Sequence, residues 1–383
     1  LTILVDASDI DRPSGVRTAV LELLRALVQQ TPDWRFVIMV SQPEPELVQS
    51  NVQQIRIPFR QRLLERFWIQ LYVTQLALTR KVDLVHFARA LGGISYPVKQ
   101  ILTVFDITTL RYPELHKRTA VWFWRYIQPW FLHRASRIIT ISEDVKNDLQ
   151  QEFCLPAECI KVIYCAPKAV FRQQQTYPLT ALREKYHLPE HYLLFVGMLA
   201  KKKNLTTLIQ ALHILQREGE SFPPLVIAGR HYHQSDDSTI FEQIHALGLD
   251  AAVIYIGELQ DEELPALYTG ADAFIFPSLH EGFGIPCVEA MLCGVPVIAA
   301  ASGAIPEIVG DAALLVNNPL NAKEFAQAIK QLLDDAALRE ILIERGAQRT
   351  QQFEWTELAT KVLKLYDEVL KGDECNTKMR KHQ

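Results

Sequence analysis

Two glutamates, Glu281 and Glu289, flank a stretch whose local structure could bind an anionic ligand. Seven residues separate them, and the loop 281–284 (Glu-Gly-Phe-Gly) leads into a helix that should begin near Ile285-Pro286, because proline suits the first helical turn. The unpaired N–H groups and positive dipole end of a helix attract anions. Glycine lets the backbone approach a ligand closely. The pattern therefore predicts an anion site with a carboxylate at its mouth.

The spacing of the two glutamates suits an elongated ligand. With Glu281 just before the helix and Glu289 inside it, they lie roughly 7 to 12 Å apart along the helix axis at 1.5 Å per residue. One carboxylate can thus meet one end of the ligand, and the other can point along it from about two turns deeper. A nucleotide sugar has this form, with hydroxylated groups on both sides of a diphosphate. The alternative, a solvated helix face that carries two acids, is not favoured.

A run of lysines provides a second group of charges. A predicted strand, 192–197, ends at Gly197, and Lys201, Lys202 and Lys203 precede a helix predicted at 205–217. Charge runs are usually solvated surface, but cations between the end of a strand and the start of a helix suit a diphosphate.

The elements around these residues alternate between strand and helix. The predicted strands are 2–6, 35–40, 83–86, 101–105, 137–142, 161–164, 192–197, 225–230, 253–257, 273–276 and 295–300. Gly15 opens a helix after the first strand, which is typical of a doubly wound sheet, but one glycine is no dinucleotide fingerprint. This alternation predicts an α/β protein with parallel sheets and ligands at their carboxyl edges. A length of 383 residues favours two or three domains.

Composition narrows the function further. The net charge of −4 argues against a nucleic-acid-binding protein. No run of 18 apolar residues is present, so no membrane span is expected. The first strand begins at Thr2, which leaves no room for a signal peptide, and we expect a cytoplasmic protein. No C-x2-C pair occurs, and we expect no metal.

The full block, Pro277-Ser-x-x-Glu281-Gly-Phe-Gly-Ile-Pro-x-x-Glu289-Ala-Met-x-x-Gly-x-Pro-Val, resembles the signature of the family 4 (group 1) retaining glycosyltransferases. This resemblance implies the GT-B fold, in which two Rossmann-like domains face a cleft. It implies an N-terminal acceptor domain at 1–170, a donor domain at 171–353 and a helix at 354–371 that packs back on the first domain. We expect the polar tail 372–383 to be disordered.

The resemblance also implies roles for individual residues. Glu281 lies by the donor sugar, Glu289 holds the ribose hydroxyls, and Lys203 is the phosphate lysine. The implied catalytic residues are Glu281, Lys203 and Asp106. The implied donor-binding residues are Gly15, Gly197, Lys202, Lys203, Gly282, Phe283, Gly284, Ile285 and Glu289.

One departure from the family pattern concerns the end of strand 101–105. Relatives commonly have His-Asp there, whereas this chain has Phe105-Asp106. The substitution puts an imidazole role in doubt and points to a different sugar or acceptor.

The predicted function is transfer of a sugar such as mannose, with retention, from a nucleotide-diphosphate donor to a glycan or lipid-linked acceptor in polysaccharide or cell-envelope glycan synthesis. The ammonium groups of Lys202 and Lys203 could replace a metal, and no cofactor is expected. Two alternatives stay open: a nucleotide-sugar epimerase on the same fold, and a non-catalytic nucleotide-sugar-binding protein. The base, linkage and oligomeric state are left undetermined.

The segment 116–134 is rich in tryptophan, phenylalanine and arginine. It could touch an anionic membrane peripherally or a lipid-linked acceptor. We favour a helix that packs on its own sheet, because aromatic stripes are usually buried.

Overall fold

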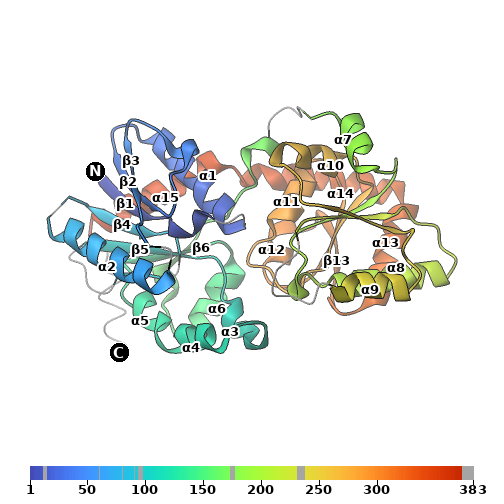
Figure 1. Cartoon of the computed structure of the whole chain (residues 1–383), viewed down its shortest axis with the longest axis horizontal. Coiled ribbons are helices and arrows are strands. Elements are labelled where there is room, and N and C mark those ends of the chain that lie inside the picture. The colour runs from blue at the N-terminus through green and yellow to red at the C-terminus, as the bar shows by residue number, and fades with distance from the viewer. Residues whose placement is uncertain are drawn as a thin grey trace. The chain divides into compact units, whose positions relative to one another are not determined.

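The computed structural model describes residues 1–11, 15–59, 61–79, 81–89, 91–93, 98–172, 177–230 and 238–372. The chain forms two compact units (Figure 1). Unit 1 comprises Leu1–Ala166 and Phe353–Gln383, and unit 2 comprises Pro167–Gln352. The expected first boundary, 170/171, lies four residues later than this division, and the second, 353/354, lies one residue later. The tail predicted to be disordered lies outside the described residues except for Gly372.

Unit 1 contains a parallel sheet of seven strands in the order β3-β2-β1-β4-β5-β6-β7. Apolar runs form most of these strands, and the central ones are buried on both faces, as parallel sheets require. The strands are β1 (Thr2–Asp6), β2 (Arg35–Val40), β3 (Val52–Arg56), β4 (Leu84–Phe87), β5 (Lys99–Val104), β6 (Arg137–Thr140) and β7 (Ile160–Val162).

The helices of unit 1 come from both ends of the chain. They are α1 (Gly15–Gln30), α2 (Arg62–Leu78), α3 (Thr108–Arg111), α4 (Arg118–Tyr126), α5 (Gln128–Leu132), α6 (Glu143–Phe153) and α15 (Trp355–Leu370). The C-terminal helix α15 packs against α1, and Gln30 donates a hydrogen bond to the carbonyl oxygen of Thr356 at 2.8 Å. The last helix is therefore part of the fold of unit 1.

Unit 2 contains a second parallel sheet, with six strands in the order β10-β9-β8-β11-β12-β13. The strands are β8 (Leu193–Val196), β9 (Leu225–Ala228), β10 (Val253–Gly257), β11 (Ala273–Phe276), β12 (Val297–Ala300) and β13 (Ala313–Val316). The helices are α7 (Leu179–Tyr186), α8 (Leu205–Arg217), α9 (Ser238–Ala246), α10 (Leu264–Thr269), α11 (Ile285–Leu292), α12 (Ile305–Val309), α13 (Ala322–Asp334) and α14 (Ala336–Arg349).

The strand order of unit 2 reverses between β8 and β11, which are adjacent and parallel. Open α/β sheets bind ligands at such a switch point, beyond the carboxyl ends of the strands. The loop that follows β8 contains the three lysines, and the loop that follows β11 contains Glu281. The topology thus brings the two charged groups identified in the sequence to one edge of one sheet.

The aromatic segment 116–134 does not form one buried helix. It divides into α4 and α5 at Ile127, just before Pro129 in the first turn of α5, and α4 contains no buried residue. Trp124 packs partly on the core of unit 1, but Trp122 is 56% exposed and Tyr126 is 62% exposed. Trp130 is also exposed, so our expectation that this stripe is buried is wrong for Trp122, Tyr126 and Trp130. No helix in the described ranges has the length and apolar character needed to cross a membrane.

Candidate active site

The loops after β8 and β11 are joined by hydrogen bonds. The backbone N–H of Leu279 donates to the carbonyl oxygen of Lys202 at 2.8 Å. The side-chain amide of Asn204 donates to the carbonyl oxygen of Pro277 at 3.0 Å. Asn204 adopts a left-handed conformation, φ 55°, between the 3-10 turn Lys201–Lys203 and helix α8. These contacts fix the lysine loop against the loop that carries Glu281.

Lys203 and Glu281 form an ion pair at this junction. The Lys203 Nζ lies 2.7 Å from Glu281 Oε1, and the two side chains are 11% and 13% exposed. The same ammonium lies 4.7 Å from the centre of the Phe276 ring, a cation–π contact. Burial opposes ionisation of Glu281, but the ammonium groups of Lys203 and Lys202 outweigh burial and lower the pKa of this carboxyl to about 2. Glu281 is therefore an anion at neutral pH.

The loop 281–284 is held in a conformation that requires glycine. Gly284 precedes α11 with φ 97°, and a Cβ on it would lie 2.3 Å from Cδ1 of Ile305. Gly303, at φ 56°, faces the loop, and its Cβ would lie 2.4 Å from the carbonyl oxygen of Glu281. Gly282 and Phe283 are buried in the same loop. The backbone of Glu281 therefore packs closely against the loop that follows β12.

Helix α11 begins at Ile285, as predicted, and no side chain caps its N-terminus. Glu289 lies one turn further along and is buried, with 8% of its surface exposed. Its Oε2 accepts a hydrogen bond of 2.9 Å from the hydroxyl of Tyr268. Burial raises the pKa of Glu289 to about 7, although the Tyr268 hydrogen bond and the Lys168 ammonium limit the rise. The two glutamates thus have opposite environments: one is paired with ammonium groups, and the other is desolvated.

The remaining predicted site residue of unit 2, Gly197, directly follows β8, and its N–H donates to the carbonyl oxygen of Ala228 at 2.9 Å. The other two predicted residues belong to unit 1. Gly15 is the first residue of α1. Asp106 accepts two hydrogen bonds from Thr108, at 3.2 Å from its N–H and 2.8 Å from its hydroxyl. Asp106 therefore stabilises the start of α3, and its catalytic role stays a prediction.

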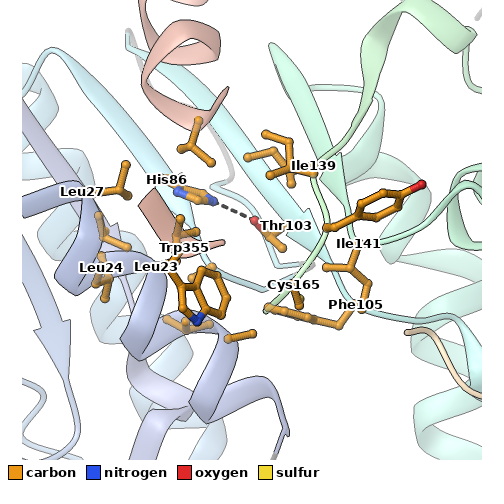
Figure 2. A pocket seen from close by; sticks show the side chains of 17 residues that line it. Leu23, Leu24, Leu27, His86, Thr103, Phe105, Ile139, Ile141, Cys165 and Trp355 are labelled. Carbon is orange, nitrogen blue, oxygen red and sulfur yellow. Dashed lines mark hydrogen bonds between the residues drawn. The ribbon is translucent and has the colours of Figure 1, made fainter. Parts of the chain in front are cut away.

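Phe105 lines a small apolar cavity of about 30 Å³ between the sheet of unit 1, α1 and α15. Figure 2 shows its ring beside Cys165 and Ile141. The histidine in this cavity is His86, which hydrogen-bonds to Tyr366 at 2.6 Å and to Thr103 at 2.8 Å. Burial lowers the pKa of His86 to about 4, so its imidazole is neutral at neutral pH. His86 is a buried structural residue of unit 1.

The sequence did not reveal Tyr268 as a partner of Glu289. Tyr268 lies in the short helix α10, 21 residues before Glu289, and belongs to none of the recognised motifs. Asn204 was visible beside the lysine run, but its role in joining two loops depends on tertiary contacts.

The two parallel sheets define the class of fold as GT-B. Sucrose-phosphate synthase from Thermosynechococcus elongatus superposes with a TM-score of 0.77 at 21% identity, over 96% of this chain and 98% of that one. HepE from Anabaena, solved in complex with UDP and glucose, also gives 0.77, at 20% identity over 96% and 100% of the two chains. At these identities the likeness establishes the fold.

The family follows from sequence comparison. The family model described as Glycosyltransferase Family 4 matches residues 13–166, and the model described as Glycosyl transferases group 1 matches residues 180–349. The O-antigen chain mannosyltransferase B of Escherichia coli is 31% identical over 269 residues, 70% of each chain. The serotype-specific mannosyltransferase WbdA of E. coli is 29% identical over 231 residues, which span 59% of this chain but 28% of WbdA. This chain belongs to the group 1 (family 4) glycosyltransferases and is a glycosyltransferase.

Proposed function

We propose that this enzyme transfers mannose, with retention of anomeric configuration, from a nucleotide-diphosphate donor to a growing glycan or a lipid-linked acceptor. The observation that carries the proposal is the Lys203–Glu281 pair at the switch point of the unit 2 sheet. The choice of mannose rests on relatives named as O-antigen chain mannosyltransferases, from E. coli and from Salmonella typhimurium. The same names support a role in polysaccharide synthesis, and we propose that the enzyme acts at the cytoplasmic face of a membrane.

The proposed mechanism stabilises the leaving diphosphate. Lys202, Lys203 and the N-terminus of α11, which no side chain caps, supply positive charge at one edge of the sheet. Preorganised charge of this kind is usually the largest catalytic contribution. These groups place positive charge where the diphosphate would lie, so we propose that the reaction does not need a metal.

The two glutamates act on different parts of the donor in this proposal. Glu281, ionised because of its low pKa, accepts hydrogen bonds from the sugar hydroxyls and holds the Lys203 ammonium in place. Glu289, held by Tyr268, receives the ribose hydroxyls. Gly197 and the loop 282–285 let the backbone approach the ligand. For unit 1, we propose that Gly15 binds the donor and that Asp106 acts in catalysis.

A transfer assay tests this function. The purified protein is incubated with a panel of nucleotide sugars that includes GDP-mannose and UDP-glucose, with mannose-containing oligosaccharides as acceptors. Release of the nucleotide diphosphate and extension of the acceptor are measured together. We expect mannose transfer that Glu281→Gln abolishes. Transfer of another hexose alone would refute mannose as the transferred sugar. Donor binding without release of the nucleotide diphosphate or extension of the acceptor would refute the assignment as an enzyme.

Titration of the variants with nucleotide diphosphate tests the orientation of the donor. Glu281→Gln should keep the affinity or increase it, because Lys203 is released for the phosphates. Glu289→Ala should weaken binding by about 1 to 3 kcal/mol, since a ribose hydroxyl loses its buried partner. The opposite pattern would show that the donor lies in the reverse direction.

A further inference from the structure

Exposed apolar side chains are concentrated on one part of unit 1. Of the 12 large hydrophobic residues that are exposed in the described ranges, eight lie between residues 59 and 130. We call these eight the apolar patch: Phe59, Leu64, Phe67, Leu71, Leu78, Trp122, Tyr126 and Trp130. Scattered exposed hydrophobics are normal, whereas a group of this size marks an interaction surface.

Helix α2 contributes four residues to this patch. Leu64, Phe67, Leu71 and Leu78 follow a helical repeat, and each is at least 45% exposed. Ile69, Val73 and Ala77 on the other side of the helix are buried in unit 1. The helix therefore has apolar side chains on two sides, and packing within unit 1 explains only the buried side.

Helices α2, α4 and α5 form one continuous surface. They follow one another along one edge of unit 1 (Figure 1), and the Arg66 guanidinium of α2 lies 5.4 Å from the centre of the Phe123 ring of α4. A cavity of about 240 Å³ lies between the helices, and Phe67, Phe123 and Phe131 are among the residues that line it. Side chains of all three helices thus line one cavity, whose lining also includes the charged residues Asp6, Arg66 and Arg89.

The segments that contain the apolar patch are strongly basic. Segments 56–82 and 115–142 contain 11 of the 40 basic residues of the chain but one of its 44 acidic residues, Glu65. They carry +10, whereas the rest of the chain carries −14. Lys117, Arg118 and Arg125 are exposed and form no ion pair with a residue in the described ranges.

We propose that the apolar patch docks on the surface of an anionic lipid bilayer. Tryptophan and tyrosine favour the boundary between headgroups and acyl chains. Basic residues beside them are attracted to anionic headgroups. A second copy of the chain is a poor occupant, because the basic segments of two copies would repel each other. This docking is independent of the donor chemistry and goes beyond the proposed transfer.

Vesicle flotation with the full chain tests the proposal. The protein is mixed with phosphatidylcholine vesicles, with or without phosphatidylglycerol, at low and at high ionic strength. We expect flotation with the anionic vesicles, weakened by salt and much lower with the neutral ones. Removal of two cations in Arg118→Gln/Arg125→Gln should lower the partition coefficient about 30-fold, since each contributes roughly fivefold. Trp122→Ser/Tyr126→Ser should lower it at least about tenfold.

Matched controls come from exposed hydrophobics outside the patch. Leu320 is 66% exposed and Ile341 is 44% exposed, and both belong to unit 2, so Leu320→Ser/Ile341→Ser should float as the wild type does. Circular dichroism checks that each variant is folded. Glu281→Gln should float normally even without turnover, which separates this proposal from the catalytic one.

Three results would overturn the docking proposal. One is equal flotation with neutral and anionic vesicles, or none with either. The second is an unchanged partition coefficient in folded patch variants. The third is a dimer in sedimentation experiments that Trp122→Ser/Tyr126→Ser dissociates, which would show that a second copy covers the patch.

Discussion

Replacing Lys203 by methionine should destabilise unit 2 by an amount set by its pairing with Glu281. Methionine keeps an apolar stem over the Phe276 ring and removes only the charge. The lowering of the Glu281 pKa from 4.5 to about 2 corresponds to roughly 3 kcal/mol. Because Lys202 supplies part of this effect, we expect Lys203→Met to lower the free energy of unfolding by about 2 kcal/mol at pH 7.

The pH dependence of this loss gives a second test. Glu281 has a lower pKa when folded than when unfolded, so the stability it contributes is present above about pH 4.5 and is lost as the pH falls through about 2. In Lys203→Met this contribution is largely absent at every pH. The difference in free energy of unfolding between wild type and variant should therefore decrease by about 1 kcal/mol as the pH is lowered from 7 to 3.5.

The assay can separate the two units. All six tryptophans lie in unit 1, so tryptophan fluorescence follows unit 1 during urea unfolding, whereas circular dichroism follows both units. The loss of stability in Lys203→Met should shift the circular dichroism transition to lower urea and leave the fluorescence transition nearly unchanged. Lys201→Met is the matched control, because Lys201 is exposed on the same 3-10 turn. A loss below about 0.5 kcal/mol, or one that does not vary with pH, would refute the reasoning.

Three further predictions concern the same site. Tyr268→Phe should weaken nucleotide diphosphate binding about tenfold with a small change in turnover at saturating donor, because Glu289 loses the hydrogen bond that orients it; equal affinity by calorimetry would contradict this. Gly284→Ala should cost about 1 to 3 kcal/mol of stability and impair donor binding, since alanine is strained at φ 97° and its Cβ would contact Ile305; an unaltered melting temperature would argue against the strain. Activity should survive EDTA because ammonium groups balance the diphosphate, and restoration of a chelated enzyme by Mg²⁺ or Mn²⁺ would show that the charge argument is wrong.

The α/β class and most strands could be predicted because buried parallel strands are apolar runs with abrupt ends. The strand 273–276 and the helix start at Ile285 match the structure. Strand β3 was missed because it has the sequence Val-Gln-Gln-Ile-Arg and, as an edge strand with no buried residue, shows no apolar run. Strand β13 has the apolar sequence Ala-Leu-Leu-Val, but a run of four apolar residues does not by itself distinguish a strand from a buried helix segment.

The candidate site was predictable where its parts are local in sequence. The loop 281–284 and the lysine run are contiguous motifs, and the strand order that brings them together follows from the doubly wound pattern. The Tyr268–Glu289 hydrogen bond depends on how α10 packs against α11, which no local pattern encodes. The exposure of Trp122 was mispredicted because composition shows that a stripe is aromatic, but not which side of it meets the sheet.

The return of the chain to unit 1 has a consequence for synthesis on the ribosome. Tyr366 of α15 hydrogen-bonds to His86 inside unit 1, and six residues of this helix are buried there. Residues 353–370 leave the ribosome only after all of unit 2, which is a single continuous segment. Unit 2 can therefore complete its fold during translation. Unit 1 cannot complete its fold until α15 has been synthesised, and the face of α1 that packs against α15 stays uncovered until then. A nascent chain of this enzyme should thus need protection by chaperones at its N-terminal half until the final helix arrives.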